Sequence, residues 1–529
     1  MTDVVADPEL DPTATYAVDP TRARRLASRV VAGPGAEQHL SRTPMTGAPL
    51  ASLPVSTPED VQVAIGTARA AQRSWARLSI ERRGEVLLRF HDLVLERQVE
   101  LLDLIQLESG KARSSAFEEV ADCAIVARYY ARSAADHLRD RRVRGGIPVL
   151  SQTVVSSHPK GVVGIVSPWN YPLSLAITDA LPALMAGNSV VLRPDQQSSL
   201  TALAGHELLL EAGLPEGVFQ VVLGPGASTG QAVVDQADYV CYTGSTRTGR
   251  SVGQAAAQRL VGFSLELGGK NSMYVAADAD VPRAVAGALR ACFASAGQLC
   301  ISAERLLVHR DVYGEFVTRF VDAVEAMRLG TALEYGYDMG TLVNQGQLDT
   351  VTRHVEDARA HGAVVLTGGR PRPDVGPFAY EPTVLTGVTA EMACRDDETF
   401  GPVVSLYEVG SDDEAIALAN DTEYGLNASV WTRDVRRGRR IAAQIQTGTV
   451  NVNDGYAAAW ASVAAPMGGM KASGIGRRHG REGIVKYTES QNVTAQHLVG
   501  IGGLPGVPDD TYAAGLTLAL RAMKRLGLT

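Results

Sequence analysis

A cysteine and a glutamate in this 529-residue chain lie among small or polar neighbours that suit covalent chemistry. Cys300 ends the stretch Ala-Gly-Gln-Leu-Cys at residues 296–300, and Glu266 opens the stretch Glu-Leu-Gly-Gly-Lys-Asn at residues 266–271. A thiolate can form a covalent adduct with a carbonyl carbon. A nearby carboxylate can activate the water that releases the acyl group. The two residue types therefore suit the oxidation of an aldehyde through a thioester.

Two more stretches accompany this pair. Residues 168–172 are Pro-Trp-Asn-Tyr-Pro, and residues 242–246 are Tyr-Thr-Gly-Ser-Thr. With the cysteine and glutamate stretches, they resemble the aldehyde dehydrogenase superfamily in order and spacing, from about residue 43 to residue 492. The resemblance implies an α/β fold: a doubly wound parallel sheet for the cofactor, an α/β catalytic domain and a small β oligomerisation flap.

The resemblance implies catalytic roles for three side chains, and each also has a simpler structural interpretation. Cys300 matches the family's nucleophile, although a lone cysteine is usually a small buried hydrophobe. Glu266 matches the general base, although a glutamate at a strand end is usually solvated or caps a helix. Asn170 matches the amide that binds the oxyanion, although it could cap the following helix. We expect the catalytic roles, and Glu266 argues against the branch that passes the acyl group to coenzyme A.

A nicotinamide cofactor is the second implication. Gly244 and Gly249 lie between a predicted strand and a predicted helix, where backbone N–H groups meet a pyrophosphate. This G-x-x-x-x-G spacing is a weak signal alone, and residues 224–226 could form only a turn. No metal is expected. The cofactor-binding residues that the resemblance implies are Trp169, Arg193, Pro194, Asp195, Gln196, Gly226, Gly244, Ser245, Gly249, Leu267, Glu398 and Phe400.

Residues 193–196, Arg-Pro-Asp-Gln, depart from the Lys-Pro-x-Glu pattern of many relatives. In those relatives the glutamate holds the ribose hydroxyls of adenosine. Arg193 suits a 2′-phosphate, and Gln196 removes a carboxylate that would repel one. Asp195 could still repel that phosphate. We expect NADP or NAD as the cofactor, with NADP favoured.

The predicted substrate is a small aldehyde. Residues 293–302 and stretches between residues 453 and 470 resemble the actinobacterial second type of succinate-semialdehyde dehydrogenase. A substrate that ends in a carboxylate should meet a cation. The better-known enzymes of this kind supply two arginines, but Thr178 and Ala294 occupy the matching positions, and Ser462 alone is a weak anchor. Either another cation binds succinic semialdehyde, the favoured substrate, or the substrate is a neutral aliphatic or aromatic aldehyde. A non-catalytic binding or structural protein is the alternative of another class.

The composition is that of an average globular protein, with 45% hydrophobic and 20% charged residues. The net charge is −8 and no basic cluster is dense, so nucleic acid is not an expected partner.

The five cysteines are scattered and odd in number, which is typical of a reducing compartment. The acidic N-terminus lacks the pattern of a secretory signal, and no apolar run has the length of a membrane span. A cytoplasmic protein is therefore expected.

Strands and helices alternate in the middle of the chain. Because helical patterns separate the strands, they indicate a parallel, doubly wound sheet. Such sheets bind ligands at the carboxyl ends of their strands, where Glu266 lies. The predicted buried strands cover residues 162–166, 189–192, 218–222, 239–242 and 263–266.

These patterns divide the chain into predicted parts. The paired edge strands at 153–158 and 492–497 would bind a neighbouring subunit in a homodimer or homotetramer. The tail would form a short amphipathic helix that packs on its own oligomer, with weak membrane attachment as the alternative. The parts are an N-terminal arm or irregular lead-in at 1–55, a dinucleotide-binding domain at 56–152 and 159–274, a catalytic domain at 275–470, bridging segments at 153–158 and 471–500, and the tail at 501–529.

Overall fold

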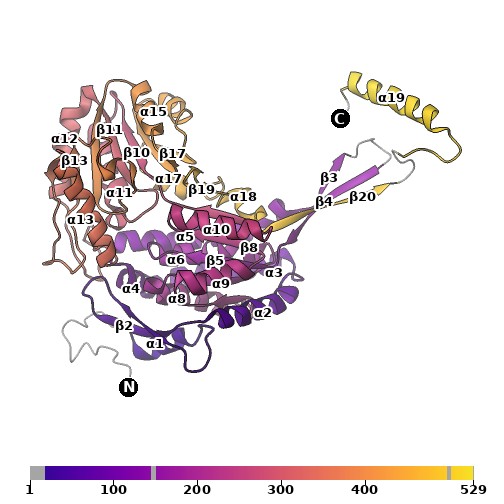
Figure 1. Cartoon of the computed structure of the whole chain (residues 1–529), viewed down its shortest axis with the longest axis horizontal. Helices are drawn as coiled ribbons and strands as arrows, with labels where there is room; N and C mark the ends of the chain where they lie inside the picture. Colours follow the sequence, from indigo (N-terminus) through magenta and orange to yellow (C-terminus); the bar gives the residue numbers. More distant parts are fainter. Residues whose placement is uncertain (1–17, 145–150, 497–501, 528–529) are drawn as a thin grey trace.

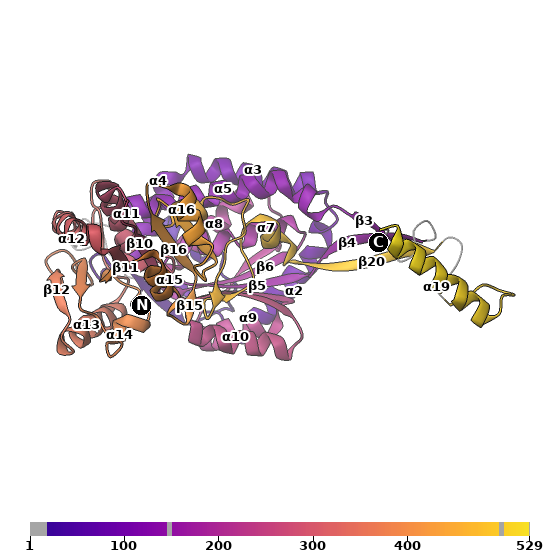
Figure 2. The same cartoon turned by 90° about the horizontal axis from the view of Figure 1, so that it is seen from above.

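The computed structural model describes residues 18–144, 151–496 and 502–527. Figure 1 shows two α/β bodies in contact, one built mainly from the first half of the chain and one from the second half. A thin β ribbon projects from the first body, and the C-terminal helix lies beyond it (Figures 1 and 2). The acidic N-terminus and the predicted strand residue His497 lie outside the described residues.

Five parallel strands and one short antiparallel strand form the sheet of the first body, in the order β19-β9-β8-β5-β6-β7. All five parallel strands lie within two residues of their predicted positions, so the predicted doubly wound sheet is confirmed. The strands are β5 (Val162–Ser167), β6 (Ser189–Pro194), β7 (Phe219–Val221), β8 (Tyr239–Thr243), β9 (Gly262–Glu266) and β19 (Gly474–Ile475).

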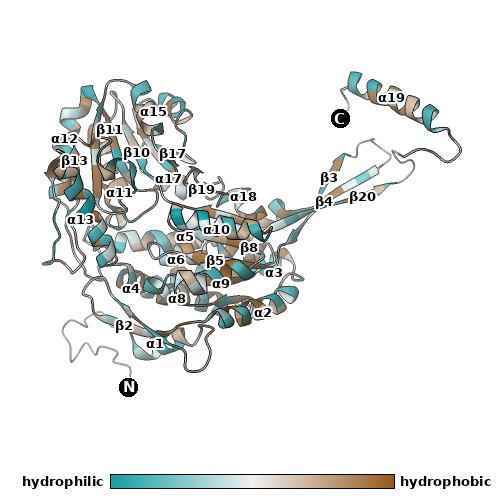
Figure 3. Cartoon of the chain, viewed as in Figure 1, coloured by the Kyte–Doolittle hydropathy of each residue, from teal (hydrophilic) through white to brown (hydrophobic). Residues whose placement is uncertain are grey.

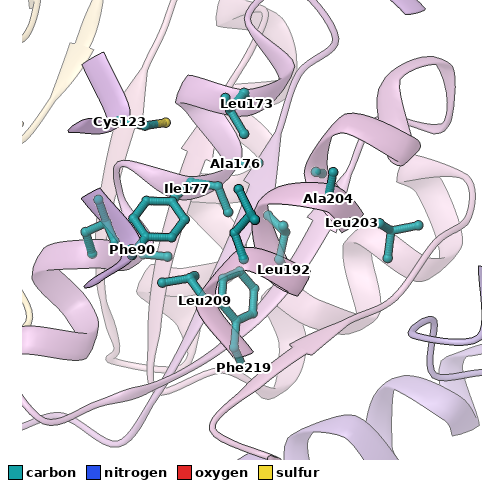
Figure 4. Close-up of a cluster of buried hydrophobic side chains, with 14 of the residues drawn as sticks. Phe90, Cys123, Leu173, Ala176, Ile177, Leu192, Leu203, Ala204, Leu209 and Phe219 are labelled. Atoms are coloured by element: carbon teal, nitrogen blue, oxygen red, sulfur yellow. The ribbon is translucent and has the colours of Figure 1, made fainter. Parts of the chain in front are cut away.

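Helices cover both faces of this sheet, because successive strand residues point to opposite faces. Val163 and Ile165 of β5 pack into a large core on one face, whereas Val162 and Val166 pack into a smaller core on the other. Figure 4 shows part of the large core, with Leu192 of β6 among the side chains of the covering helices. A strand buried on both faces is a continuous apolar run, which is why these strands were predictable. The large core is covered by α3 (Ile80–Glu96), α4 (Gln98–Ser109), α5 (Arg113–Leu138), α6 (Pro172–Ile177), α7 (Ala180–Met185) and α8 (Ser199–Glu211), and the smaller core by α2 (Pro58–Trp75), α9 (Gln231–Gln236) and α10 (Thr246–Gln258).

The second body has a sheet in the order β12-β13-β14-β11-β10-β16-β17, parallel except for β12. It begins at Asn271, four residues before the predicted start of the catalytic domain at 275, and the domain boundaries remain predictions. Its strands are β10 (Asn271–Val275), β11 (Ala303–His309), β12 (Val364–Thr367), β13 (Thr383–Thr386), β14 (Val403–Val409), β16 (Asn427–Trp431) and β17 (Thr449–Val452). Its helices are α11 (Val281–Phe293), α12 (Arg310–Glu325), α13 (Gln345–Ala360), α14 (Ala393–Asp396), α15 (Asp412–Asn420), α16 (Val435–Ala442) and α17 (Ala457–Trp460). A short pair, β15 (Tyr424–Gly425) with β18 (Met470–Lys471), lies beside it.

Three antiparallel strands form the ribbon: β3 (Arg141–Arg144), β4 (Ser151–Pro159) and β20 (Thr488–Gln496). Val155 of β4 pairs with Asn492 of β20, so the two predicted flap segments do meet. Helix α18 (Gly480–Val485) precedes β20, and the predicted tail helix is α19 (Asp509–Arg525). Apolar and polar residues alternate along α19 in Figure 3, and all its residues have exposed or half-exposed side chains. In the described ranges, no helix is both long and apolar enough to cross a membrane.

The described part of the N-terminal arm is not irregular, so that prediction was wrong. Its helix was missed because only two of its residues, Ala23 and Leu26, are buried, too few for a visible period. Asp19 does cap this helix by accepting from the N–H of Arg22, and Pro20 takes its first position. The elements of the arm are α1 (Pro20–Ala27), β1 (Gln38–Arg42) and β2 (Pro49–Pro54).

Two helical regions of the first body are each divided in two. Between α3 and α4 the backbone leaves the helical conformation at Arg97, with φ −102° and ψ 18°. Between α6 and α7 the break lies at residues 178–179. Pro182 lacks the N–H that would bond to the carbonyl of Thr178 four residues earlier, which accounts for the second break.

Candidate active site

Cys300, Glu266 and Asn170 line one cavity of about 240 Å³. Asn170 follows β5, Glu266 is the last residue of β9, and Cys300 precedes β11 of the second sheet. The cavity therefore lies where the strands of the first sheet end and the second body begins, as expected for a ligand site in such a fold. We call it the larger cavity, to distinguish it from a smaller one, described below, that Cys300 also lines. Its walls also contain the predicted cofactor residues Trp169, Gly244, Ser245, Leu267, Glu398 and Phe400.

Tight backbone geometry holds the loop that carries Cys300. Ser295 and Ala296 adopt the left-handed region with φ 55° and 56°. Gly297 has φ 71°, and a Cβ there would lie 2.1 Å from the carbonyl oxygen of Gly401. Only glycine fits at this position, which explains the glycine of the Gly-Gln-Leu-Cys stretch.

The Cys300 thiol is protonated at rest. Burial, together with the carboxyl groups of Glu398 and Glu266, raises its pKa to about 12. The guanidinium of Arg478 acts in the opposite direction. Because the thiolate is the nucleophile, the reaction needs a proton acceptor close to this sulfur.

Glu266 is buried and has the properties of a base. Burial raises its pKa to about 7, although Arg478 and Lys486 lower it. Its Oε1 is buried and has no hydrogen-bond partner among the described residues. A buried carboxylate oxygen with no partner can readily accept a proton from water or from a thiol.

Hydrogen bonds fix both the side chain and the backbone of Asn170. Its Nδ2 donates to the carbonyl of Gln298, two residues before Cys300, at 3.1 Å. Its own carbonyl accepts from Lys111 Nζ at 2.6 Å, and this lysine forms a buried pair with Glu119 at 2.7 Å. One Nδ2 hydrogen therefore remains for a ligand, and the amide is fixed in place before the ligand arrives.

The predicted cofactor residues Glu398 and Phe400 lie on one tightly held turn. Glu398 Oε1 accepts from the N–H of Gly269 at 2.9 Å, and burial with the neighbouring Glu304 raises the pKa of Glu398 to about 8. Glu304 also accepts from the N–H of Phe400 at 3.0 Å. Gln347 donates to the carbonyl of Phe400 at 2.8 Å and lines the larger cavity. Gln347 was not predicted from the sequence, because it lies in the first turn of α13, far from every motif.

Ser245 and Gly249 have different functions at the start of α10, the helix that follows β8. Ser245 is the N-cap of α10, its side chain accepting from the N–H of Thr248, so the N-terminus of α10 faces the larger cavity. Gly249 lies one turn into the helix, and a Cβ there would be 2.4 Å from Leu267 Cδ2. Gly249 therefore permits close packing of α10 on the end of β9 and does not line the larger cavity.

Arg193 is buried at the end of β6 and is already engaged. Its Nε and Nη2 donate to the carbonyl of Gly224 at 2.9 and 2.6 Å, and its Nη1 lies 3.7 Å from Asp195 Oδ2. The guanidinium therefore fixes the loop before the π-helical turn Gly226–Gly230, which leaves fewer donors for a phosphate than the sequence suggested. The predicted cofactor residues outside the larger cavity are Arg193, Pro194, Asp195, Gln196, Gly226 and Gly249.

Cys300 and Asn170 also line a second cavity, of about 40 Å³, which we call the smaller cavity. Cys300 therefore separates a space lined by the predicted cofactor residues from a space lined by other side chains. The remaining walls of the smaller cavity are Tyr171, Ser174, Leu175, Leu299, Ile301, Tyr456, Trp460, Met467, Arg478 and His479.

Comparison with known proteins identifies the family. The profile described as "Aldehyde dehydrogenase family" matches residues 31–493. The chain belongs to the aldehyde dehydrogenase family. This dehydrogenase is 53% identical over 481 residues to a protein of Mycolicibacterium smegmatis provisionally named succinate-semialdehyde dehydrogenase [NADP(+)], covering 91% of this chain and 93% of that protein. A similarly named protein of Mycobacterium ulcerans is 51% identical over the same shares of the two chains.

Solved structures have the same fold as this dehydrogenase. An Escherichia coli NADP-dependent enzyme matches with a TM-score of 0.83 and 34% identity, over 87% of this chain and 95% of that one. Betaine aldehyde dehydrogenase from Staphylococcus aureus, in complex with NAD+, matches with a TM-score of 0.84 and 30% identity, over 92% and 99%. The chain is an NAD(P)-dependent aldehyde dehydrogenase, so the predictions of the enzyme class and of an aldehyde substrate are confirmed.

Proposed function

We propose that this enzyme oxidises succinic semialdehyde to succinate with NADP+, through a thioester on Cys300. The observation that carries the proposal is the position of Cys300, which lines two cavities at once. The larger cavity has the features of a nucleotide site, and the side chain of Arg478 in the wall of the smaller cavity carries a positive charge. The names of the mycobacterial relatives support both the substrate and the cofactor.

The residues of the larger cavity fit a nicotinamide nucleotide. The N-terminus of α10 opens toward it, and its backbone N–H groups would hold the pyrophosphate. Glu398, next to Phe400 in the cavity wall, would hold the nicotinamide ribose. A nicotinamide nucleotide held by these residues would supply the hydride acceptor that the oxidation of the aldehyde carbon needs, which would leave a thioester on Cys300.

Acylation depends on Cys300 and Asn170. The proton of the Cys300 thiol passes to solvent water as the sulfur forms a bond with the aldehyde carbon, and the carbonyl oxygen becomes an oxyanion. The free Nδ2 hydrogen of Asn170 and the backbone N–H of Cys300 donate to that oxyanion. Since Asn170 is already held by Gln298 and Lys111, little ordering is required when the oxyanion forms.

Deacylation depends on Glu266. Its carboxylate takes a proton from a water molecule, and the resulting hydroxide attacks the thioester carbon. Glu266 returns this proton to the Cys300 sulfur as the C–S bond breaks, and the carboxylic acid departs. The unpartnered Oε1 of Glu266 and its pKa of about 7 suit this role near neutral pH.

We also propose that the enzyme is a cytoplasmic homodimer or homotetramer. The ribbon has two edge strands, β3 and β20, and most of its side chains are exposed or half-exposed. Edge strands of this kind can pair with another chain. The five cysteines are all free, which suits a reducing compartment.

A substrate panel tests the proposed function. Reduced-cofactor formation should be greatest with succinic semialdehyde and NADP+, and coenzyme A should not be required. Equal or better kcat/KM with neutral aldehydes would favour the broad-specificity alternative, which has some support because Thr178 and Ala294 carry no charge. A tenfold preference for NAD+ would reject the choice of cofactor. No reduction with any aldehyde would reject the proposal, and a requirement for coenzyme A would reject release of the acyl group to water.

A further inference from the structure

We propose that Arg478 binds the second, anionic end of the substrate and thereby selects aldehydes that carry a carboxylate. This proposal rests on the proposed function, because it concerns which aldehyde the Cys300 site accepts. It answers the question of which cation replaces the arginines that are missing at Thr178 and Ala294.

Arg478 lies on the opposite side of the nucleophile from the predicted cofactor residues. It belongs to the loop between β19 and α18 and lines the smaller cavity together with Cys300. Its side chain is 11% exposed, so its charge acts in a largely desolvated space. Cys300 and Arg478 both line this cavity, so a substrate attacked by the Cys300 sulfur would have its far end directed toward the Arg478 guanidinium.

The guanidinium of Arg478 still has donors available. Its Nη2 donates to Thr178 Oγ1 at 2.7 Å and lies 3.3 Å from Asp179 Oδ2. Its Nε and Nη1 have no hydrogen-bond partner in the described part of the chain. Neither nitrogen is among the buried polar atoms that lack a partner, so both reach open space. A carboxylate can accept two parallel hydrogen bonds from such a guanidinium edge.

Thr178 accounts for the position of this charge. The better-known succinate-semialdehyde enzymes have arginines at the two positions that Thr178 and Ala294 occupy here. The Thr178 hydroxyl accepts from Arg478, so a guanidinium lies beside α6 although it comes from the β19–α18 loop. The missing cation is therefore supplied by a residue some 300 positions away in the sequence.

The acids around Arg478 offset its positive charge only in part. Asp179 is shared between two cations, because Lys486 Nζ also lies 3.4 Å from it. Asp122 accepts from the hydroxyl of Ser174, and burial raises its pKa to about 6. Glu266 also acts on Arg478, and burial raises the pKa of this carboxyl to about 7. Glu118, which contacts Tyr171 and Tyr456 of the cavity wall, is occupied by hydrogen bonds from these two residues and from Arg290. An anionic substrate end is thus favoured over a cationic one.

Three aldehydes with four-carbon chains and different charges test the proposal. For the wild-type enzyme with NADP+, kcat/KM should decrease from succinic semialdehyde to butanal to 4-(trimethylammonio)butanal. In Arg478→Gln, kcat/KM for succinic semialdehyde should fall about 100-fold, mainly through KM, since hydrogen bonds to a charged group are lost. The effect of Arg478 on the pKa of Cys300 and Glu266 is common to both aldehydes. The ratio of kcat/KM for succinic semialdehyde to kcat/KM for butanal should therefore fall at least about 30-fold in this variant, through the lost hydrogen bonds to the carboxylate.

Lys486→Met is the matched control. It removes the other cation that pairs with Asp179, but Lys486 does not line the smaller cavity. It should change kcat/KM for succinic semialdehyde and butanal by the same factor. Arg478→Lys keeps one charge without the planar edge, so it should retain part of the preference for the anion.

The outcomes separate the two proposals. An equal loss for both aldehydes in Arg478→Gln means that Arg478 supports only the fold or the ionisation of Cys300 and Glu266, and this inference is then wrong. A wild-type enzyme without preference for succinic semialdehyde contradicts the proposed function instead. If Arg478→Gln does not fold, Arg478→Lys decides: an unchanged KM for succinic semialdehyde overturns the inference, and a selective rise supports it.

Discussion

The side-chain amide of Asn271 donates a 2.7 Å hydrogen bond to the backbone carbonyl of Cys300. The same nitrogen donates to the carbonyl of Ser302 at 2.8 Å. The last residue of the Glu-Leu-Gly-Gly-Lys-Asn stretch therefore holds the loop of the nucleophile. This contact explains why the two stretches form one site although Glu266 and Cys300 are thirty-four residues apart.

Replacement of Asn170 tests the oxyanion site. Asn170→Ala should lower kcat about 10²–10³-fold with a small change in KM, because the lost donor acts mainly on the tetrahedral intermediate. Steady-state kinetics with succinic semialdehyde measure this split. A change in KM alone would mean that Asn170 binds the ground state only.

The pH dependence of deacylation follows from the pKa of Glu266. Only the carboxylate form can take a proton from water, and its pKa is raised to about 7 by burial. When hydrolysis is rate-limiting, kcat should therefore be low at pH 5.5, rise through about pH 7 and level off above pH 8. Glu266→Gln should remove this rise. A wild-type profile that is flat between pH 5.5 and 8.5 would exclude Glu266 as the base.

The same carboxyl group should make the folded state less stable at high pH. Its folded pKa of about 7 lies above the ordinary value of 4.5, so the folded protein binds more protons between these values. Ionisation therefore costs folding stability as pH rises from 4.5 to 7, by about 3 kcal/mol in total. The Tm of Glu266→Gln minus that of the wild type should be more positive at pH 8.5 than at pH 5.5. A difference that is constant or falls with pH would contradict the raised pKa.

Gly297 should tolerate no side chain. In Gly297→Ala the new methyl would overlap the carbonyl of Gly401, and φ of 71° is unfavourable for alanine. We expect a loss of at least 100-fold in kcat and a Tm lower by several degrees, measured by activity and calorimetry. Gly314→Ala on α12 is the control, since its Cβ would have open space and alanine favours a helix, so Tm should stay equal or rise. Equal behaviour of the two variants would mean that the loop of Cys300 is not held as described.

Much of the site was predictable because the chemistry-bearing stretches follow buried parallel strands. Such strands are continuous apolar runs, and their carboxyl ends meet at one edge, which brings Asn170, Ser245 and Glu266 together. Their spacing along the chain also matches a known family. The assignment of roles to these residues remains a prediction that the experiments above test.

Other features depend on contacts that no local pattern contains. Arg478 lines the smaller cavity through a bond to Thr178, which lies in a different element 300 residues earlier. Gln347 reaches the Phe400 turn from the start of α13. The sequence suggested Arg193 as a phosphate ligand, but its guanidinium is bound to the carbonyl of Gly224, because burial requires its donors to be satisfied.

The most direct test is rapid mixing of Glu266→Gln with succinic semialdehyde and NADP+, beside Cys300→Ala. The Cys300→Ala protein should bind the cofactor and give no reduced cofactor. Glu266→Gln should give a burst approaching one reduced cofactor per active site and then stop, because the thioester on Cys300 forms but water is not activated. A steady-state rate in either variant equal to that of the wild type, or no burst in Glu266→Gln, would contradict the mechanism.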